Sequence, residues 1–530
     1  MDEHAFAIVH KDVLSPRWSG YLFVVLLLVY FFIGVHYVLQ TPLWQVPDEP
    51  AHMNYVLHVA RTGTFPVLQP GDYDADYLER IKAAKFPPDM SITSIRYEYH
   101  QPPLYYILAA GVVRSLAPQV LVESPSFGVL TRAVHVVRFF SLALSLGILY
   151  ATFLITRILF PWQPSLALAA TALVAFIPQH VAMMSGVNND VMGELVLAFF
   201  LLQLVRDIQS TSPSSRAWVR RGILLGLVLL AKTTVYVPAF LALGAFHLLR
   251  ATEVHPRSPW RREVLEGGTE VFVGLLLALP FFAHNVSAYG WPDVLGWRRH
   301  AAIVVGQPTT SEYIAQHGWV AYLHRAVTWT FRSFWGQFGW MGVFMDARVY
   351  KVLAYFTALL FIGIGVFLLH GCRPRLERLI LRKKTLSPEC LTEYQHNGLG
   401  VLSAAAVGTW IAYLGYNITF LQHQGRYLFT GLVPLAVISI PGIWILLDPR
   451  QARRAMTVSA LLGWLALGLA LANIAGFDRW DALTLFGMAF WFGLAEKFPR
   501  WRPLWLGLPF MGLALLDGVA LYQFILPALT

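Results

Sequence analysis

Two adjacent carboxylates, Asp48 and Glu49, lie in the sequence VPDEPAH, nine residues after a long apolar run. Acids at such a boundary could serve as a general base and as a contact to a substrate or a metal ion. Asp48 also suits the N-cap of a helix reaching about Arg61, because Glu49 and the proline after it suit the first turn. Both interpretations can hold together, since a cap fixes the backbone that directs the carboxylates. We expect Asp48 and Glu49 to be the catalytic residues.

A second motif, RYEYHQPPLYYILAA at residues 96–110, joins polar side chains to a proline pair. Consecutive prolines end a helix before them and favour the first turn of the next one. Glu98, His100 and Gln101 could reach a sugar or a phosphate, and Tyr105 follows them closely. The structural alternative is that the histidine is only hydrogen-bonded and that the tyrosines form an interfacial aromatic belt. We expect His100, Gln101 and Tyr105 to contact the substrate.

The motif SGVNNDVMGE, residues 185–194, places Asn189 and Asp190 at the start of another apolar run. Asn and Asp are favoured N-cap residues, so capping of that helix is the structural alternative. As part of a site, the two residues would present an amide and a carboxylate to the substrate. Glu194 lies one turn further into the run, where an ionisable side chain is costly and marks a candidate site.

Two cations complete the set of candidate residues. Lys232 is the charged residue within the apolar stretch 222–249, and Arg426 lies in LQHQGRYLF at residues 421–429, beside Gln424. Arg suits two-pronged contact to phosphate, and a recessed Lys suits a lipid-linked phosphate. The alternatives are a lysine that extends to the membrane interface and an arginine that anchors there. We expect Lys232 and Arg426 to bind a donor phosphate and Gln424 to contact the substrate.

The composition indicates the kind of fold that must position these residues. Of 530 residues, 56% are hydrophobic and 13% are charged, and the mean hydropathy is +0.54. Soluble domains carry about 25% charged residues, so a soluble globular domain, a disordered chain and a coiled coil are excluded. The sequence therefore predicts an all-α polytopic membrane protein.

Apolar runs of about 20 residues are needed to cross a bilayer as helices. The stretch 222–249 is long for one helix, but arginines flank both of its ends. We therefore expect two short helices there, with their tip at residues 232–234, and about 13 spans in the whole chain. The other runs lie at 21–39, 134–156, 165–180, 190–205, 268–285, 349–369, 398–420, 427–447, 455–474, 482–495 and 503–525.

Lysine and arginine positions predict the orientation of these spans. With the N-terminus inside, 23 of the 40 Lys and Arg residues fall on the cytoplasmic side, including the basic stretch RPRLERLILRKK. Basic residues concentrate on that side of membrane proteins. The net charge of +10 therefore reflects topology and indicates no nucleic-acid partner. All of the motifs above then fall on the outer face. The expected cytoplasmic segments are 1–17, 157–164, 206–221, 250–263, 371–396, 448–454 and 497–502.

Two long outer loops, 40–133 and 286–348, connect the expected spans. Amphipathic stretches such as 49–61 and 77–86 predict short helices on the membrane surface within them. No P-loop, dinucleotide fingerprint, HExxH or GxSxG motif occurs, so nothing indicates a nucleotide handled in the cytoplasm.

The motifs in their order resemble those of bacterial glycosyltransferase family 39-like proteins. The residues that carry the resemblance are PDEPAH, HQPPLYY, NND, LAKTTVYVP, HNVSAYGWPDVLG, RSFWGQFGWMGV and QGRYLF. Such proteins belong to the type C superfamily of polytopic membrane glycosyltransferases, which includes protein O-mannosyltransferases and the lipid A aminoarabinose transferase. The resemblance covers about residues 18–447. It predicts a type C glycosyltransferase-like transmembrane domain at 1–447, followed by C-terminal transmembrane helices at 448–530.

The resemblance implies a sugar donor linked to a polyprenyl phosphate and transfer at the extracytoplasmic face of the cell membrane. An acidic residue in the first outer loop of the family maps onto Asp48, which would be the general base of an inverting transfer, with Glu49 as its partner. Arg426 and Lys232 would stabilise the leaving phosphate. The acceptor would be a lipid, a glycan or a protein. Metal dependence differs across the superfamily, and Asp48 and His52 share a helix face that could hold a divalent metal.

Two other functions fit the same features. A transporter or flippase of a lipid-linked saccharide would carry ionisable groups at mid-membrane and broken helices in matching halves. A polymerase or ligase of lipid-linked saccharides would use the same carrier on the same face.

Overall fold

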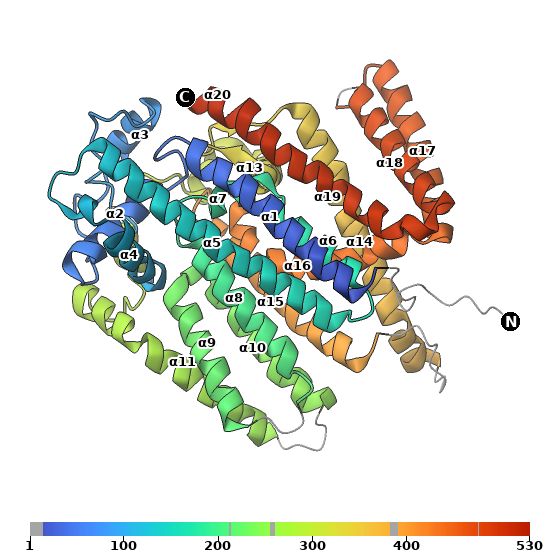
Figure 1. Cartoon of the computed structure of the whole chain (residues 1–530), viewed down its shortest axis with the longest axis horizontal. Helices are drawn as coiled ribbons and strands as arrows, with labels where there is room; N and C mark the ends of the chain where they lie inside the picture. Colours follow the sequence, from blue (N-terminus) through green and yellow to red (C-terminus); the bar gives the residue numbers. More distant parts are fainter. Residues whose placement is uncertain (1–13, 211–213, 255–259, 382–390, 475) are drawn as a thin grey trace.

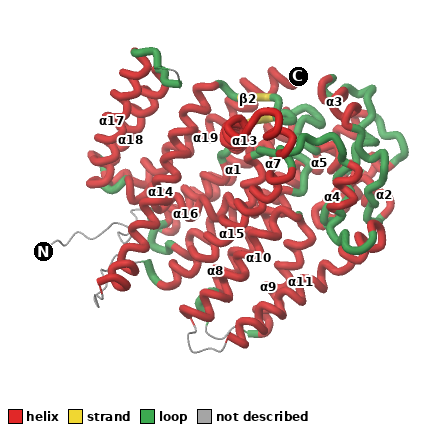
Figure 2. Tube along the Cα trace, turned by 180° about the vertical axis from the view of Figure 1, so that it is seen from behind, coloured by secondary structure: helices red, strands yellow, loops and turns green. Residues whose placement is uncertain are grey.

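The computed structural model describes residues 14–210, 214–254, 260–381, 391–474 and 476–530. Within these ranges the protein is a long bundle of helices, with irregular loops gathered at one end (Figures 1 and 2). Among the described residues, nine helical segments are long and apolar enough to cross a membrane, so the chain is a multi-pass membrane protein. They centre on α1 (Pro16–Gln40), α5 (Phe127–Leu159), α10 (Tyr236–Leu249), α11 (Trp260–Tyr289), α14 (Ala347–Leu381), α15 (Glu393–Thr419), α16 (Leu432–Leu446), α17 (Pro449–Leu471) and α19 (Arg502–Val519).

The predicted spans all coincide with helices, but a count of 13 is not confirmed by length and apolarity. The described residues contain nine such spans, or ten when one bent pair is included. Helices α8 (Asp190–Asp207) and α18 (Arg479–Lys497) carry charged residues near both of their ends, which makes them less apolar. Helix α9 (Ser215–Ala231) has only 17 residues. These three helices are therefore too polar or too short to count by that measure, although they lie where spans were expected.

The stretch predicted as a helical hairpin does break at its centre. Helix α9 ends at Ala231, Lys232 is extended, and the short η2 (Thr233–Val235) leads into α10. Helix α9 packs mainly against α11, whereas α10 packs mainly against α15. The break thus places Lys232 at the tip of two short helices, as the flanking arginines indicated.

The run at 165–180 differs from the prediction of one span. It forms α6 (Pro164–Ala175) and α7 (Pro178–Met184), bent by 70° relative to each other. Pro178 explains the break, because proline lacks an N–H donor and drives the preceding residue, Ile177, into an extended conformation. The bend turns α7 toward the loops at the end of the bundle.

The two loop regions expected on the outer side carry the predicted short helices at 49–61 and, ending a little earlier than expected, at 77–86. Most residues of the first helix are buried, and it packs mainly against the helix at Leu104–Leu116. Lys85 and Phe86 have positive φ angles, which ends the second helix before them. The elements of this region are α2 (Glu49–Thr62), α3 (Ala75–Ala83), α4 (Leu104–Leu116), η1 (Pro118–Leu121), α12 (Trp297–Ile303), α13 (Thr310–Trp335), β1 (Gln337–Phe338) and β2 (Val343–Phe344).

The C-terminal segment returns to the N-terminal helix. After the α17–α18 hairpin, α19 continues through the π-helical η6 (Ala520–Ile525) into α20 (Leu526–Leu529) and runs beside α1 (Figure 1). The hydroxyl of Tyr37 on α1 donates to the carbonyl oxygen of Asp517 at 2.9 Å. The C-terminus therefore lies near the loop that follows α1.

Candidate active site

Asp48 occupies the position before α2 in a conformation that non-glycine residues rarely adopt. Its φ is 66°, in the left-handed region, and its side chain makes no cap hydrogen bond. The carboxylate instead accepts from the Tyr97 hydroxyl at 2.8 Å and from Arg426 Nη2 at 2.7 Å. Backbone strain of this kind is concentrated at functional sites. The N-cap position predicted for Asp48 is thus correct, but its carboxylate faces other outer elements.

Arg426 reaches Asp48 from the short η4 (Gly425–Gly431), which leads into α16. Gly425 allows this approach, because any Cβ at that position would overlap the backbone of Thr330 and Phe334 on α13. The Gly425 N–H donates to Ser333 Oγ at 2.6 Å and completes the docking. A tight backbone contact therefore aims the guanidinium at the first outer loop.

Lys232 forms a second ion pair close to the first. Its Nζ lies 2.6 Å from Asp190 Oδ1 and donates to Asn189 Oδ1 at 2.9 Å. The amide of Asn189 in turn donates to Gln101 Oε1 at 3.4 Å. Gly193 on α8 keeps the space open, since a Cβ there would lie 3.2 Å from Lys232 Cβ. Three of the sequence motifs therefore meet at one point.

The two ion pairs form one electrostatic unit with His52 and Glu98. Burial raises the pKa of Asp48, but the charges of Arg426 and His52 and the hydrogen bonds it accepts lower that pKa to about 2. Burial lowers the pKa of His52, which lies near Glu98, Lys232 and Asp48. Burial raises the pKa of Glu98, with Asp48 adding to this effect and His52 and Lys232 opposing it. Sequence reasoning placed Glu98 within reach of a sugar or a phosphate and considered His52 only as a metal contact with Asp48.

Glu49, predicted as the catalytic partner of Asp48, points away from it. Its side chain is fully buried and forms a two-pronged ion pair with Arg138 on α5, with both contacts at 2.7 Å. It also accepts from the backbone N–H groups of Trp44 and Val187. Glu49 therefore holds the loop that carries Asp48, and we assign it a positioning role in place of the catalytic one. Sequence analysis missed Arg138, although an arginine inside an apolar run marks a functional or structural constraint.

Other predicted contact residues lie at the edge of this cluster or outside it. His100 faces His300 with ring centroids 4.4 Å apart, and burial lowers the pKa of His100 to about 4. Tyr105 is fully buried and shares a hydrogen bond with Ser141 on α5. Gln424 donates to Gln422 at 2.6 Å. Tyr105 and Gln424 thus pack the surroundings of the site.

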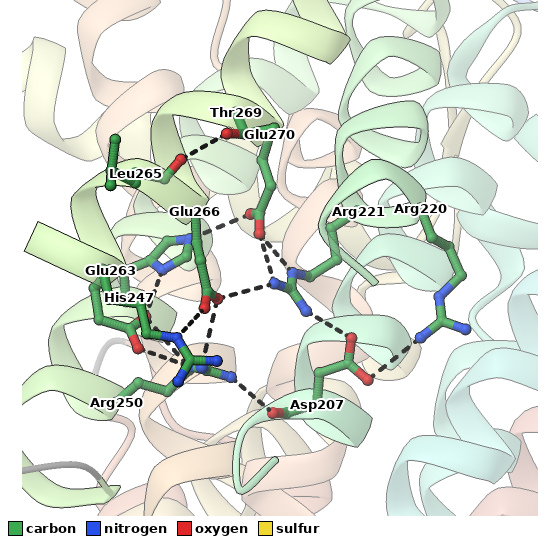
Figure 3. Close-up of polar contacts among 11 residues, drawn as sticks. Asp207, Arg220, Arg221, His247, Arg250, Glu263, Leu265, Glu266, Thr269 and Glu270 are labelled. Atoms are coloured by element: carbon green, nitrogen blue, oxygen red, sulfur yellow. Dashed lines mark hydrogen bonds and ion pairs between the residues drawn. The ribbon is translucent and has the colours of Figure 1, made fainter. Parts of the chain in front are cut away.

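A separate charged network lies at the other end of the α9–α10 hairpin (Figure 3). Arg221 pairs with Glu270 at 2.6 Å and with Asp207 at 2.8 Å, and Arg250 pairs with Glu263 at 3.1 Å. Arg221 precedes Lys232 by eleven residues, about 16 Å along a helix. This network joins α8, α9, α10 and α11 far from Asp48.

The same network contains a group of three potential metal ligands among the described residues, namely His247, Glu263 and Glu266. The guanidinium of Arg250 already lies among their oxygens, at 3.1 Å from Glu263 and 3.4 Å from Glu266. Both carboxylates are therefore compensated by an arginine. The predicted metal contact of Asp48 and His52 remains a hypothesis.

Comparison with known proteins finds a family model that matches part of the chain. Residues 127–285 match the family model of dolichyl-phosphate-mannose-protein mannosyltransferases. This segment contains Asn189, Asp190 and Lys232. A search of curated proteins by sequence finds no match.

Solved structures share the fold. The structure of ArnT from Cupriavidus metallidurans bound to undecaprenyl phosphate matches with a TM-score of 0.51 and 15% identity, covering 96% of this chain and 77% of that one. The apo state of the same protein matches with a TM-score of 0.52 and 16% identity, covering 95% and 76%. The chain therefore shares its fold with ArnT and, over residues 127–285, resembles the dolichyl-phosphate-mannose-protein mannosyltransferases, in agreement with the resemblance predicted from the motifs.

Proposed function

We propose that this protein is a membrane glycosyltransferase that moves a sugar from a polyprenyl-phosphate donor to an acceptor hydroxyl at the extracytoplasmic face of the cell membrane. The observation that carries the proposal is the meeting of the Asp48–Arg426 and Lys232–Asp190 ion pairs at one end of the bundle. A carboxylate base and two cations are what this transfer requires. The undecaprenyl phosphate bound to the structurally similar ArnT supports the donor class.

The transfer step assigns a part to each group. The acceptor hydroxyl gives its proton to Asp48, and its oxygen bonds to the anomeric carbon from the face opposite the leaving group. The bond from that carbon to the phosphate oxygen breaks, and the phosphate leaves with the electron pair. Arg426 and Lys232 stabilise its charge. The configuration at the anomeric carbon is inverted.

The ion pair between Asp48 and Arg426 makes the basicity of Asp48 depend on whether the donor is bound. A carboxylate with a pKa of about 2 accepts protons poorly at neutral pH. When the donor phosphate binds Arg426, the guanidinium charge is shared between the phosphate and Asp48. Arg426 then lowers the pKa of Asp48 less strongly, and burial raises that pKa. Donor binding therefore prepares the base, and the acceptor meets an active carboxylate only in the complex.

The remaining residues act around this core. Asn189, which accepts a hydrogen bond from Lys232, and Gln101, which accepts one from Asn189, would contact the sugar. His100 lies one residue away, where its contact with His300 joins the two outer loops. Tyr105 and Gln424 contribute by packing.

The first test compares wild type with Asp48→Asn in membranes supplied with radiolabelled polyprenyl-phosphate sugar. Loss of a general base is expected to reduce transfer by about 10²- to 10⁴-fold. Asp89→Asn is the matched control, because it changes an exposed acid of the same outer loop. Full transfer by well-expressed Asp48→Asn would refute the role of Asp48.

The same assay separates the other functions. Transfer from an oligosaccharide pyrophosphate alone would favour a polymerase or ligase. Movement of the labelled lipid across sealed vesicles, with no new glycosidic bond, would favour a transporter.

A further inference from the structure

A buried acid–histidine pair lies one helical turn from the Lys232–Asp190 ion pair, and the proposed reaction does not use it. Glu194 follows Asp190 by four residues on α8, so both carboxylates lie on one face of that helix. The Nε2 atom of His180 on α7 lies 3.0 Å from Glu194 Oε2. His180 is completely buried, and Glu194 is 5% exposed. An ionisable pair is costly at such a position, which points to a function.

The surroundings of the His180 ring decide where its proton lies. Nδ1 is buried and has no hydrogen-bond partner among the described residues. A proton on Nδ1 would be an unsatisfied buried donor, which is costly. The proton of the neutral ring therefore lies on Nε2 and is donated to Glu194 Oε2. His180 thus supplies the carboxylate with a hydrogen bond but with no positive charge.

Glu194 forms no ion pair with a lysine or an arginine among the described residues. Lys232 contacts Asp190 at 2.6 Å, and Arg426 contacts Asp48 at 2.7 Å. Two cations therefore serve three carboxylates, and Glu194 is the one without a direct cation contact. The charged and titratable groups that interact electrostatically with Glu194 are His180 of α7, Asp190 of α8, Lys232 at the hairpin tip and the phenol of Tyr30 on α1.

A donor phosphate at the two cations would add a further negative charge to this cluster. Repulsion among anions is strong where burial reduces screening by water, and binding of a proton by one carboxylate relieves it. Glu194 is the carboxylate best suited to take that proton, since Oε1 makes no hydrogen bond with another described residue. Glu98 also interacts with Lys232, but it is partly exposed, so solvent screens its charge more strongly.

We propose that Glu194 takes up one proton from solvent when the donor phosphate binds, so that donor binding and protonation of Glu194 favour each other. The proton adds to Oε1, His180 continues to donate to Oε2, and the carboxylate becomes a neutral acid. This inference rests on the proposed function and adds to it a dependence of donor affinity on pH. Because the complex holds more protons than the free protein, affinity for the donor rises as the pH falls.

Calorimetric titration with farnesyl methyl phosphate tests this coupling without turnover. The probe is a phosphodiester that carries a single negative charge at all pH values near neutrality, and it has no sugar to transfer. Titrations in phosphate and in Tris buffer, which differ in ionisation enthalpy, count the protons taken up on binding. We expect an uptake of about half a proton to one proton for each molecule bound, and a loss of affinity of about three- to ten-fold for each unit of rising pH.

Glu194→Gln keeps the shape of the side chain and an acceptor for His180 but removes the charge. We expect this variant to bind the probe without proton uptake, and to bind it about three-fold or more tightly than the wild type in mildly alkaline buffer. A residue that only supports the fold would weaken binding when changed, so a gain in affinity separates the two roles. Glu123→Gln is the matched control, because it removes the same charge from an exposed position and should keep the proton uptake of the wild type.

Two results would overturn the proposal. The first is binding of the probe by the wild type without proton uptake, a measurement that needs no variant. The second is proton uptake that persists in Glu194→Gln and is lost in Glu98→Gln, because the proton would then belong to the other acid near Lys232. Proton uptake by a protein that transfers no sugar would instead support the coupling and refute the proposed reaction, so the two failures give different results.

Discussion

Asp48 and Arg426 form a largely buried ion pair between residues 378 positions apart. Removing both charges from water is costly, and the pair is tolerated because Tyr97 also donates to the carboxylate. Such a pair stabilises the fold weakly as a unit, yet losing one member leaves an uncompensated charge. The two residues therefore depend on each other for stability as well as for catalysis.

Arg426→Gln tests this dependence. The change leaves Asp48 charged and buried, so we expect the free energy of unfolding at neutral pH to fall by about 3–5 kcal/mol. With Arg426 absent, burial raises the pKa of Asp48, so the loss shrinks as the pH falls and the carboxyl group is protonated. Thermal unfolding in detergent at several pH values measures both effects.

A double variant provides the control. Asp48→Asn with Arg426→Gln carries no charge at either position and is expected to unfold at a higher temperature than Arg426→Gln alone. If the double variant is no more stable than the single one, the two side chains are not coupled.

At the residue scale, the sequence predicts which charged residues could take part in chemistry, but not which contacts they make. Asp48, Arg426, Lys232 and Asp190 were selected because each charged group lies next to an apolar run, where charge is costly. Their pairing was beyond the sequence, because the partners come from distant helices. Glu49 was assigned to catalysis for the same reason that Asp48 was, and only the position of Arg138 shows that its carboxylate is already occupied.

Among the helices, the break between α9 and α10 matters most for the site. An uninterrupted helix would place Lys232 in the middle of a span, whereas the break places it at the tip of the hairpin, beside Asp190. The far ends of both helices are fixed by the Arg221 and Arg250 network (Figure 3). The α9–α10 hairpin is thus fixed by ion pairs at one end and carries Lys232 of the candidate site at the other.

Glu270→Gln tests the anchor. Glu270 is fully buried and accepts from Arg221 Nε at 2.8 Å, so its loss leaves a buried guanidinium with one partner fewer. We expect the free energy of unfolding to fall by about 3 kcal/mol. Transfer per folded molecule should persist, because Lys232 lies at the opposite end of the hairpin.

Arg220→Ala is the matched control on the same helix. Its side chain is 55% exposed and 3.5 Å from Asp207, so its removal should change stability by about 1 kcal/mol or less. Equal destabilisation by both variants would contradict the anchoring role of Glu270. Denaturant titration of the purified protein in detergent distinguishes these outcomes.

Helix positions were predictable because apolar runs of sufficient length have few alternatives in a membrane. The hairpin at 222–249 was also predictable, since basic residues at both ends require the chain to turn back. The bend between α6 and α7 is not predicted from the sequence, although Pro178 lies in the apolar run. Hydropathy alone does not indicate a change in the direction of the helix axis.

Considered as a whole, the molecule separates its charges between two ends. The network of Arg221 and Arg250 occupies one end, and the candidate active site occupies the other. The distribution of basic residues predicts that the first end faces the cytoplasm. The proposed reaction then takes place on the opposite side of the membrane from the nucleotide pools of the cell.

Cysteine labelling tests this orientation in intact cells. After replacement of Cys372 and Cys390 by serine, single cysteines are introduced by Ser124→Cys in the first outer loop and Ser215→Cys at the start of α9. Both serines are exposed. A membrane-impermeant maleimide should label Ser124→Cys in intact cells and Ser215→Cys only after lysis. The reverse pattern would invert the topology and move the proposed reaction to the cytoplasmic side.

The contact between Asp48 and Arg426 also sets an order for biogenesis. Ribosomes deliver the first outer loop early, whereas the arginine emerges only after most of the helices have entered the bilayer. Until then the carboxylate has no guanidinium, and the phosphate-binding half of the site is incomplete. A nascent or truncated chain that stops before residue 426 therefore lacks the Asp48–Arg426 ion pair, and the proposed site is completed only in one of the last steps of insertion.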